Sequence, residues 1–180
     1  MDGVRIRAAE EGDLERFAEM TYNSILTEKE MGVGRYVDDS VMLMKEVVRW
    51  VMECWVDMSC LMLVAEAYLE TDEGGVAKEP EIVGILNGRL EKQCGTMKHD
   101  IVGTVDTTSV EMEWRRSDVA TELQLIFEAL AIREGVNRFE MFVYHKNVGP
   151  QRGLKKLGYA HDYVRLAKEV DGNPDSKGDQ

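Results

Sequence analysis

The feature that most constrains the fold is a strand, a helix and a second strand in the second half of the chain. Residues 101–110 are rich in valine and threonine, which favours a strand, and residues 119–133 place apolar side chains on one helical face. Gly135 ends that helix, and residues 138–144 again have a strand pattern. Connections of this kind are right-handed and set the two strands parallel in one sheet. The chain is therefore expected to be an α/β protein.

The remaining patterns predict a mixed sheet flanked by helices. Two helical stretches follow the first strand, and two further strands, separated by a polar loop with glycines and a proline, are expected to form a hairpin. This order of elements implies helices packed on the faces of one sheet. The predicted strands are residues 4–7, 61–69, 81–90 and 163–170, and the predicted helices are residues 14–26, 40–58 and 151–157.

The length of 180 residues fits a single domain, which we expect to span residues 1–170 and to be followed by a disordered polar tail at residues 171–180. No apolar run approaches the ~18 residues needed to cross a bilayer, so no membrane partner is expected. The N-terminus lacks the pattern of a secretory signal. The three cysteines form no CxxC pair, which argues against a disulfide framework. These features together favour a cytoplasmic location.

The charge and the histidine content of the chain limit the classes of ligand that it is expected to bind. A formal net charge of −12 argues against general nucleic-acid binding, which depends on lysine and arginine meeting phosphates. Three isolated histidines lack the spacing of metal ligands, so no metal is expected. An acidic surface attracts amines and other cations, so an anionic ligand requires a local basic site.

The helix predicted at residues 40–58 has an unusually broad apolar face, which includes Met44, Val48 and Trp55. The simplest interpretation is a helix buried against the sheet. A wall of a substrate pocket and a surface for a homodimer are the alternatives, because methionine adapts to varied partners.

The segment from Val110 to Ala120 joins a strand to a helix and carries Arg115 and Arg116 just before the helix begins. Unsatisfied amides and the positive end of a helix stabilise phosphate oxygens, and arginines add charge-assisted hydrogen bonds. A phosphate site is therefore predicted. Alternatively, Ser117 and Asp118 are ordinary helix-capping residues, and a capping carboxylate would occupy the amides that a phosphate needs.

This segment resembles the acyl-CoA loop of the GNAT superfamily of acetyl-CoA-dependent N-acyltransferases. In that family a strand ending in valine leads to an R/Q-x-x-G-x-G/A loop, and here Arg115 stands at its first position and Ala120 at its last. Asp118 replaces the middle glycine. The segments Val64-Ala-Glu66 and Ile82-Val-Gly84 resemble the second and third strands of a GNAT domain.

The C-terminal part also resembles the N-x-x-A-x-x-x-Y-x-x-x-G-F ending of the family. Asn147 matches its first position, and the sequence Leu157-Gly-Tyr159 matches its last residues. Pro150 stands at the alanine position, and Leu154 stands where many members carry the tyrosine that protonates the leaving thiolate. Together the matches span most of the chain.

The resemblance implies a transferase that moves the acetyl group of acetyl-CoA to a primary amine of a small molecule or protein, in a GNAT-like mixed sheet flanked by helices. It leaves open a catalytically degenerate GNAT-like domain with a binding or regulatory role, because Asp118 and Leu154 depart from the family pattern. Candidates for the general base are Asp106, Glu66 and His145, and Tyr144 is the candidate acid. The residues implied in acetyl-CoA binding are Val110, Arg115, Arg116, Ser117, Asp118, Val119, Ala120 and Asn147.

Overall fold

The computed structural model describes residues 3–32, 36, 38–68, 80–93 and 99–162. The chain divides into two compact units, residues 1–148 and 149–180. The strand predicted at residues 163–170 and the predicted tail lie outside the described residues. The domain boundary at residue 170 therefore stays a prediction.

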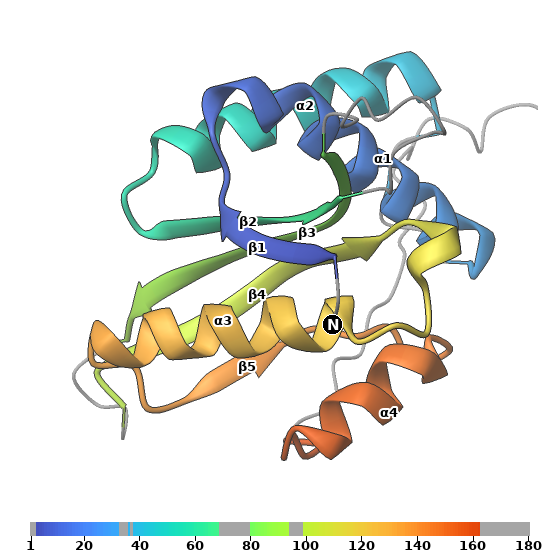
Figure 1. Ribbon diagram of the computed structural model, residues 1–180. Helices are drawn as coiled ribbons and strands as arrows, with labels where there is room; N and C mark the ends of the chain where they lie inside the picture. The colour runs from blue at the N-terminus through green and yellow to red at the C-terminus, as the bar shows by residue number, and fades with distance from the viewer. Residues whose placement is uncertain (1–2, 33–35, 37, 69–79, 94–98, 163–180) are drawn as a thin grey trace, which may run out of the picture. The chain divides into compact units, whose positions relative to one another are not determined.

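One five-stranded mixed sheet forms the centre of the first unit. Its strands are β1 (Val4–Ala8), β2 (Cys60–Ala67), β3 (Glu81–Lys92), β4 (Ile101–Val110) and β5 (Phe139–Met141). They lie side by side in chain order; the first three pairs of neighbours are antiparallel, and β4 and β5 are parallel (Figure 1). The predicted hairpin of β2 and β3 and the predicted parallel crossover are both confirmed.

Helices cover both faces of the sheet. The helices α1 (Leu14–Glu30) and α2 (Ser40–Val56) lie on one face, and α3 (Val119–Arg133) lies on the other (Figure 1). Successive strand residues point to opposite faces, so in β3 Ile85 joins the core under α1 and α2 and Leu86 joins the core under α3. The α/β class predicted from the sequence is confirmed.

Helix α3 packs directly on the sheet at Gly88 of β3. A Cβ atom at this position would lie only 2.5 Å from the ring of Phe127, so a larger residue would push the helix away. Phe127 also meets Phe139 of β5 edge to ring, with 6.1 Å between the ring centroids. These contacts set the position of α3, and therefore of the loop that enters it, relative to β4.

The prediction that the whole apolar face of α2 is buried is wrong. Four side chains, Leu43, Val47, Val51 and Cys54, are buried against α1 and the sheet. In contrast, Val48 and Trp55 are 44% and 37% exposed, and Met58 lies beyond the end of the helix and is 98% exposed. The face is broader than the surface that α1 and the sheet can cover.

Four elements, β1, α2, β2 and β3, have boundaries that differ from the predicted ones by one or two residues, and three others differ by three residues or more. Helix α1 continues to Glu30, and β5 ends at Met141, so the prediction of a strand as far as Tyr144 is wrong. The helix α4 (Val148–Lys156), of which all but the first residue belong to the second unit, begins three residues earlier than predicted. Element ends depend on the surroundings as much as on the local pattern, which explains such shifts.

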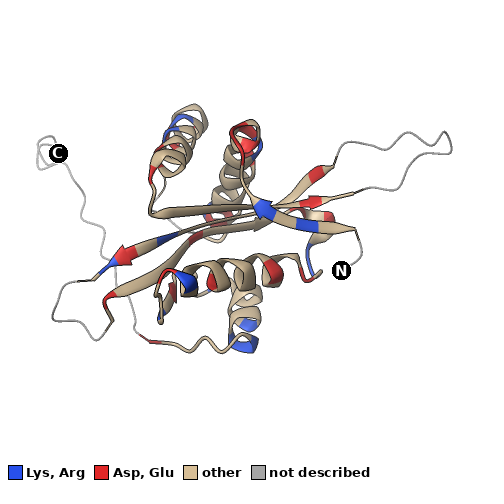
Figure 2. Ribbon diagram, turned by 60° about the vertical axis from the view of Figure 1, so that its left-hand side comes forward, with Lys and Arg blue, Asp and Glu red and all other residues tan. Residues whose placement is uncertain are grey.

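Charged residues are spread over the strands and both helical layers of the first unit (Figure 2). Among the helices in the described ranges, none combines the length and the apolar character that crossing a membrane requires.

Candidate functional site

The strands β4 and β5 form a fork. β5 pairs with β4 only from Gly103 to Val105, whereas β4 continues to Val110 beside β3. The register between β3 and β4 shifts by one residue at Asn87 and Gly88, which leaves Asp106 as the extra residue of a bulge. Within the described chain, no strand pairs with the outer edge of β4 beyond Val105. This edge offers backbone donors and acceptors to an extended ligand.

The open edge of β4 leads into the loop identified from the sequence. After Val110 the chain makes a short 3-10 turn, Met112–Trp114, and α3 begins at Val119. Arg116 has a φ angle of 72°, in the left-handed region that residues other than glycine rarely adopt. The guanidinium of Arg115 donates from Nε to the carbonyl of Val110 at 3.3 Å.

Asp118 does not cap helix α3. It stands at the residue before the helix, but its side chain makes no capping hydrogen bond. The nearby polar contacts belong to Ser117, whose Oγ donates to the carbonyl of Trp114 at 2.5 Å and accepts from the amide of Val119 at 3.4 Å. The interpretation in which a capping carboxylate occupies the helix amides is therefore not what the structure contains.

Several amides at the start of α3 are left for a ligand. Within the described part of the chain, the amides of Asp118, Ala120 and Thr121 donate to no acceptor. Such amides, together with the positive end of the helix macrodipole, favour phosphate oxygens. Arg115 and Arg116 are exposed beside them. The loop therefore combines three free donors with two exposed positive charges.

Glu111 at the end of β4 is not simply a solvated charge. Its carboxylate forms a 2.5 Å ion pair with Arg16 of α1, and Arg16 also binds Glu19 at 2.6 Å. The pairing offsets a negative charge close to the proposed phosphate site.

Asp106 lies at the base of the fork, in a polar cluster on the face covered by α1 and α2. Its Oδ2 accepts from Nε of Arg89 at 2.8 Å and from the side-chain amide of Asn87 at 3.3 Å. Burial raises the pKa of Asp106 above its ordinary value, and the hydrogen bond and charge of Arg89 offset this only in part. A carboxylate with a raised pKa is a stronger proton acceptor than an ordinary one.

Sequence reasoning missed the two partners of Asp106. A signal was present, because Asn87 interrupts the apolar run from Ile82 to Leu86 at a position where a strand in the middle of a sheet is expected to be buried. Asn87 is completely buried and Arg89 partly so.

Glu66, another candidate base, is held elsewhere in the sheet. Its carboxylate pairs with Arg7 of β1 at 2.6 Å, and the same guanidinium binds Asp13 at 2.6 Å. The strand β3 separates β2 from β4. The structure therefore does not bring Glu66 together with Asp106.

Tyr144, His145 and Asn147 lie on the segment that follows β5. The rings of Tyr144 and His145 meet edge to face with centroids 4.5 Å apart, and the amide of Asn147 donates to the carbonyl of Tyr144 at 2.8 Å. Lys146 donates from Nζ to the carbonyl of Met31 at 3.2 Å and so ties this segment to the end of α1.

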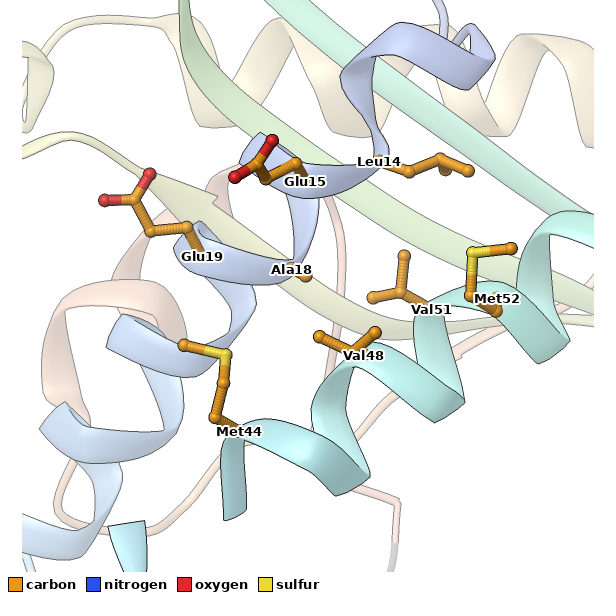
Figure 3. A pocket seen from close by; sticks show the side chains of 8 residues that line it. All are labelled: Leu14, Glu15, Ala18, Glu19, Met44, Val48, Val51 and Met52. Atoms are coloured by element: carbon orange, nitrogen blue, oxygen red, sulfur yellow. The ribbon is translucent and has the colours of Figure 1, made fainter. Parts of the chain in front are cut away.

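A groove of about 500 Å³ lies between α1 and α2. Apolar side chains from both helices form its walls, and two carboxylates stand on the side of α1 (Figure 3). Met44 and Met52 of α2 point into it, as expected if this helix forms a pocket wall. The lining residues are Leu14, Glu15, Ala18, Glu19, Met44, Val48, Val51 and Met52. In the ranges that the structure describes, no group of three or more histidine, cysteine or acidic side chains is arranged to bind a metal.

The fold is shared with several solved structures. A transcriptional regulator from Bacillus halodurans is 22% identical, with a TM-score of 0.68 and coverage of 93% of this chain and 99% of the other. A predicted acetyltransferase from Clostridium acetobutylicum, solved with acetyl-CoA, is 15% identical, with a TM-score of 0.67 and coverage of 91% and 96%.

A third structure, an aminoglycoside antibiotic 6'-N-acetyltransferase from Acinetobacter haemolyticus, is 19% identical, with a TM-score of 0.63 and coverage of 93% and 99%. No family model and no curated protein matches the sequence. The chain therefore has the fold of the GNAT-type acetyltransferases, as the motifs of the sequence predicted.

Proposed function

We propose that this protein is an N-acetyltransferase that moves the acetyl group of acetyl-CoA to a primary amine. One observation carries the proposal: the open edge of β4 leads from the carboxylate of Asp106 to a helix start with free amides and two arginines. The fold shared with acetyltransferases, one of them solved with acetyl-CoA, supports it.

The two ends of acetyl-CoA would meet different parts of this surface. The phosphates would lie at the start of α3, on the amides of Asp118, Ala120 and Thr121 and the guanidinium groups of Arg115 and Arg116. The extended pantetheine arm would run along the edge of β4 toward Asp106, with backbone hydrogen bonds like those of an added strand. The roles of Val110 and Asn147 are inferred from the family motif.

The chemistry requires removal of two protons from the nitrogen and delivery of one to sulfur. The ammonium first loses a proton; the resulting amine nitrogen forms a bond to the carbonyl carbon of the acetyl-CoA thioester and loses its second proton, the carbon–sulfur bond breaks, and the thiolate takes up a proton. Asp106 would remove the proton of the incoming ammonium, because it lies where β5 stops pairing with β4 and burial raises its pKa. Tyr144 would protonate the thiolate, and His145 is the alternative base.

The acceptor is a small molecule or a protein that carries a primary amine. The acidic character of the chain, with a net charge of −12, favours the approach of a cation. One of the solved structures with this fold is an aminoglycoside acetyltransferase, whose substrates are amines.

A second function is a catalytically degenerate binding or regulatory domain. Two observations favour it: Leu154 stands where the family has its thiolate-protonating tyrosine, and one solved structure with this fold is a transcriptional regulator. Such a domain could still bind CoA without turning it over.

Calorimetric titration of CoA into the full chain at low ionic strength tests the proposal. We expect saturable binding, and we expect Arg115→Ala to weaken it about 10- to 100-fold, because a charge-assisted hydrogen bond contributes roughly 1.5–3 kcal/mol. The matched control is Lys155→Ala, which removes a positive charge from α4 in the second unit.

Three outcomes separate the alternatives. Equal losses in the two variants would mean diffuse attraction and would reject the loop as the site. Absence of binding at millimolar CoA would reject the enzyme. Binding without release of free thiol from acetyl-CoA in the presence of a panel of primary amines would favour the regulatory domain.

A further inference from the structure

Asn87 is an unusual residue for the centre of a sheet. It lies in β3 between β2 and β4, it is completely buried, and its neighbours Ile85 and Leu86 belong to the two apolar cores. Asparagine is depleted in strands, and a buried polar side chain is tolerated only when its hydrogen bonds are made. The position therefore calls for an explanation beyond packing.

Two contacts fix the orientation of the Asn87 side chain. The amide nitrogen Nδ2 donates to Oδ2 of Asp106 at 3.3 Å and to Sγ of Cys54 at 3.6 Å. The reverse orientation would place the amide oxygen against the carboxylate oxygen, two acceptors in contact. The nitrogen must therefore face Asp106.

This orientation leaves the other end of the amide unsatisfied. Within the described part of the chain, Oδ1 of Asn87 is buried and accepts no hydrogen bond. A buried acceptor without a donor destabilises the fold, whereas a leucine of similar shape would pack there without that penalty. Asn87 is thus a poor choice for stability, and the one good polar contact it makes to a charged group is with Asp106.

We propose that Asn87 is a positioning residue that holds the carboxylate of Asp106 at the fork between β4 and β5, ready to accept the proton of the acceptor ammonium. This inference rests on the proposed acetyltransferase function. The guanidinium of Arg89 donates to Oδ2 of Asp106, but the Arg89 side chain is 33% exposed. Its Nε also lies 3.9 Å from Oε1 of Glu91. Asn87 approaches the same oxygen from the buried side, so the two donors together define where the carboxylate stands.

The other titratable groups around Asp106 do not compete for this role. Burial raises the pKa of the Cys54 thiol to about 12, and burial also raises the pKa of Cys60. Both thiols are therefore neutral at physiological pH and add no negative charge to the cluster. Among the described residues, the charged or titratable groups of β2, β3 and the end of α2 at this cluster are Arg89, the two thiols, Glu91 and Asp57, whose charge acts on Arg89 and Cys60.

The test is a comparison of Asn87→Leu with Thr21→Val in the full chain. Thr21 of α1 is also buried, with a hydroxyl that lacks a partner in the described residues, and it contacts neither Asp106 nor the loop before α3 in any hydrogen bond of the described chain. Both variants remove an unsatisfied polar atom, so both are expected to keep or raise the melting temperature. Only Asn87→Leu removes a donor from Asp106.

Carbon-13 NMR of the aspartate carboxyl groups, with Asp106 assigned by Asp106→Asn, provides the main measurement. In Asn87→Leu we expect the titration midpoint of Asp106 to move to higher pH, because the ionised form loses a hydrogen bond and gains an apolar neighbour. The kcat of acetyl transfer should fall about 10- to 100-fold with little change in KM. In Thr21→Val neither quantity should change.

The inference fails if the Asp106 titration is the same in Asn87→Leu and wild type, or if Thr21→Val shifts it equally. If the leucine variant does not fold, the same two measurements are made on Asn87→Ala. If wild type acetylates no amine while the Asp106 titration responds to Asn87→Leu, Asn87 does position Asp106 but the proposed reaction is wrong. The NMR and kinetic readouts thus separate the two failures.

Discussion

Two clusters on the same sheet each pair an arginine with acidic side chains, but the two pairings have different consequences. In the first, Arg7 of β1 lies between the carboxylates of Asp13 and Glu66. In the second, Arg89 of β3 binds Asp106 of β4, with Asn87 as the only other side-chain donor among the described residues.

The two clusters shift the pKa of their aspartates in opposite directions. The hydrogen bonds of Arg7 lower the pKa of Asp13, and the amide of Glu10 adds a further donor at 2.6 Å. Burial raises the pKa of Asp106 despite Arg89. The comparison teaches that an arginine beside a carboxylate does not itself indicate a structural or a catalytic role; the hydrogen bonds that the carboxylate accepts in total decide.

The largest expected effect is the loss of acetyl-transfer rate in the variant Asp106→Asn. We expect kcat to fall about 10²- to 10⁴-fold, the usual contribution of a general base. The free energy of unfolding at neutral pH should stay the same or rise, because a raised pKa means that the ionised carboxylate is less stable in the folded chain than in the unfolded one. Steady-state kinetics and urea denaturation measure the two quantities. A large loss of stability would place Asp106 in the same structural class as Asp13.

The second largest expected effect is a loss of stability in the variant Arg7→Met. Removal of this guanidinium leaves Asp13 and Glu66, both largely buried, without their partner. We expect a loss of about 3 kcal/mol in the free energy of unfolding, measured from the denaturation midpoint at constant m. The control is Arg89→Met, which leaves Asp106 with the Asn87 donor and should cost less. Equal losses would remove the distinction between the clusters.

The smallest expected effect is on how the stability of the protein changes when the pH is lowered. Because the folded pKa of Asp13 is lowered, its contribution to stability is full above the unfolded value of about 4 and disappears as the pH falls through the folded value. Asp106 acts with the opposite sign, since its contribution is full below the unfolded value and decreases as the pH rises through the folded value. As the pH is lowered from 7 to 3, the melting temperature should therefore fall less steeply in Asp13→Asn than in wild type. In Asp106→Asn it should fall more steeply than in wild type. Identical slopes in all three proteins would contradict both assignments.

The sequence alone determined the elements whose pattern is local. Strand β4 and helix α3 begin and end at the predicted residues, 101–110 and 119–133, because side-chain periodicity, β-branched residues and the stop at Gly135 are encoded within each segment. The parallel pairing of β4 with β5 followed from the handedness of the connection between them. The GNAT fold followed from motifs spread along the chain.

The tertiary structure decided what depends on register and on side-chain orientation. Asn87 meets Asp106, nineteen residues away, only because a bulge shifts the pairing of β3 and β4, and a shift of one residue moves every side chain to the other face. Whether Asp118 caps α3 or leaves its amides free is a choice of rotamer that the sequence does not encode. The pKa of Asp106 is likewise set by burial and by Arg89 of β3, and both act on the carboxyl group only when the chain folds.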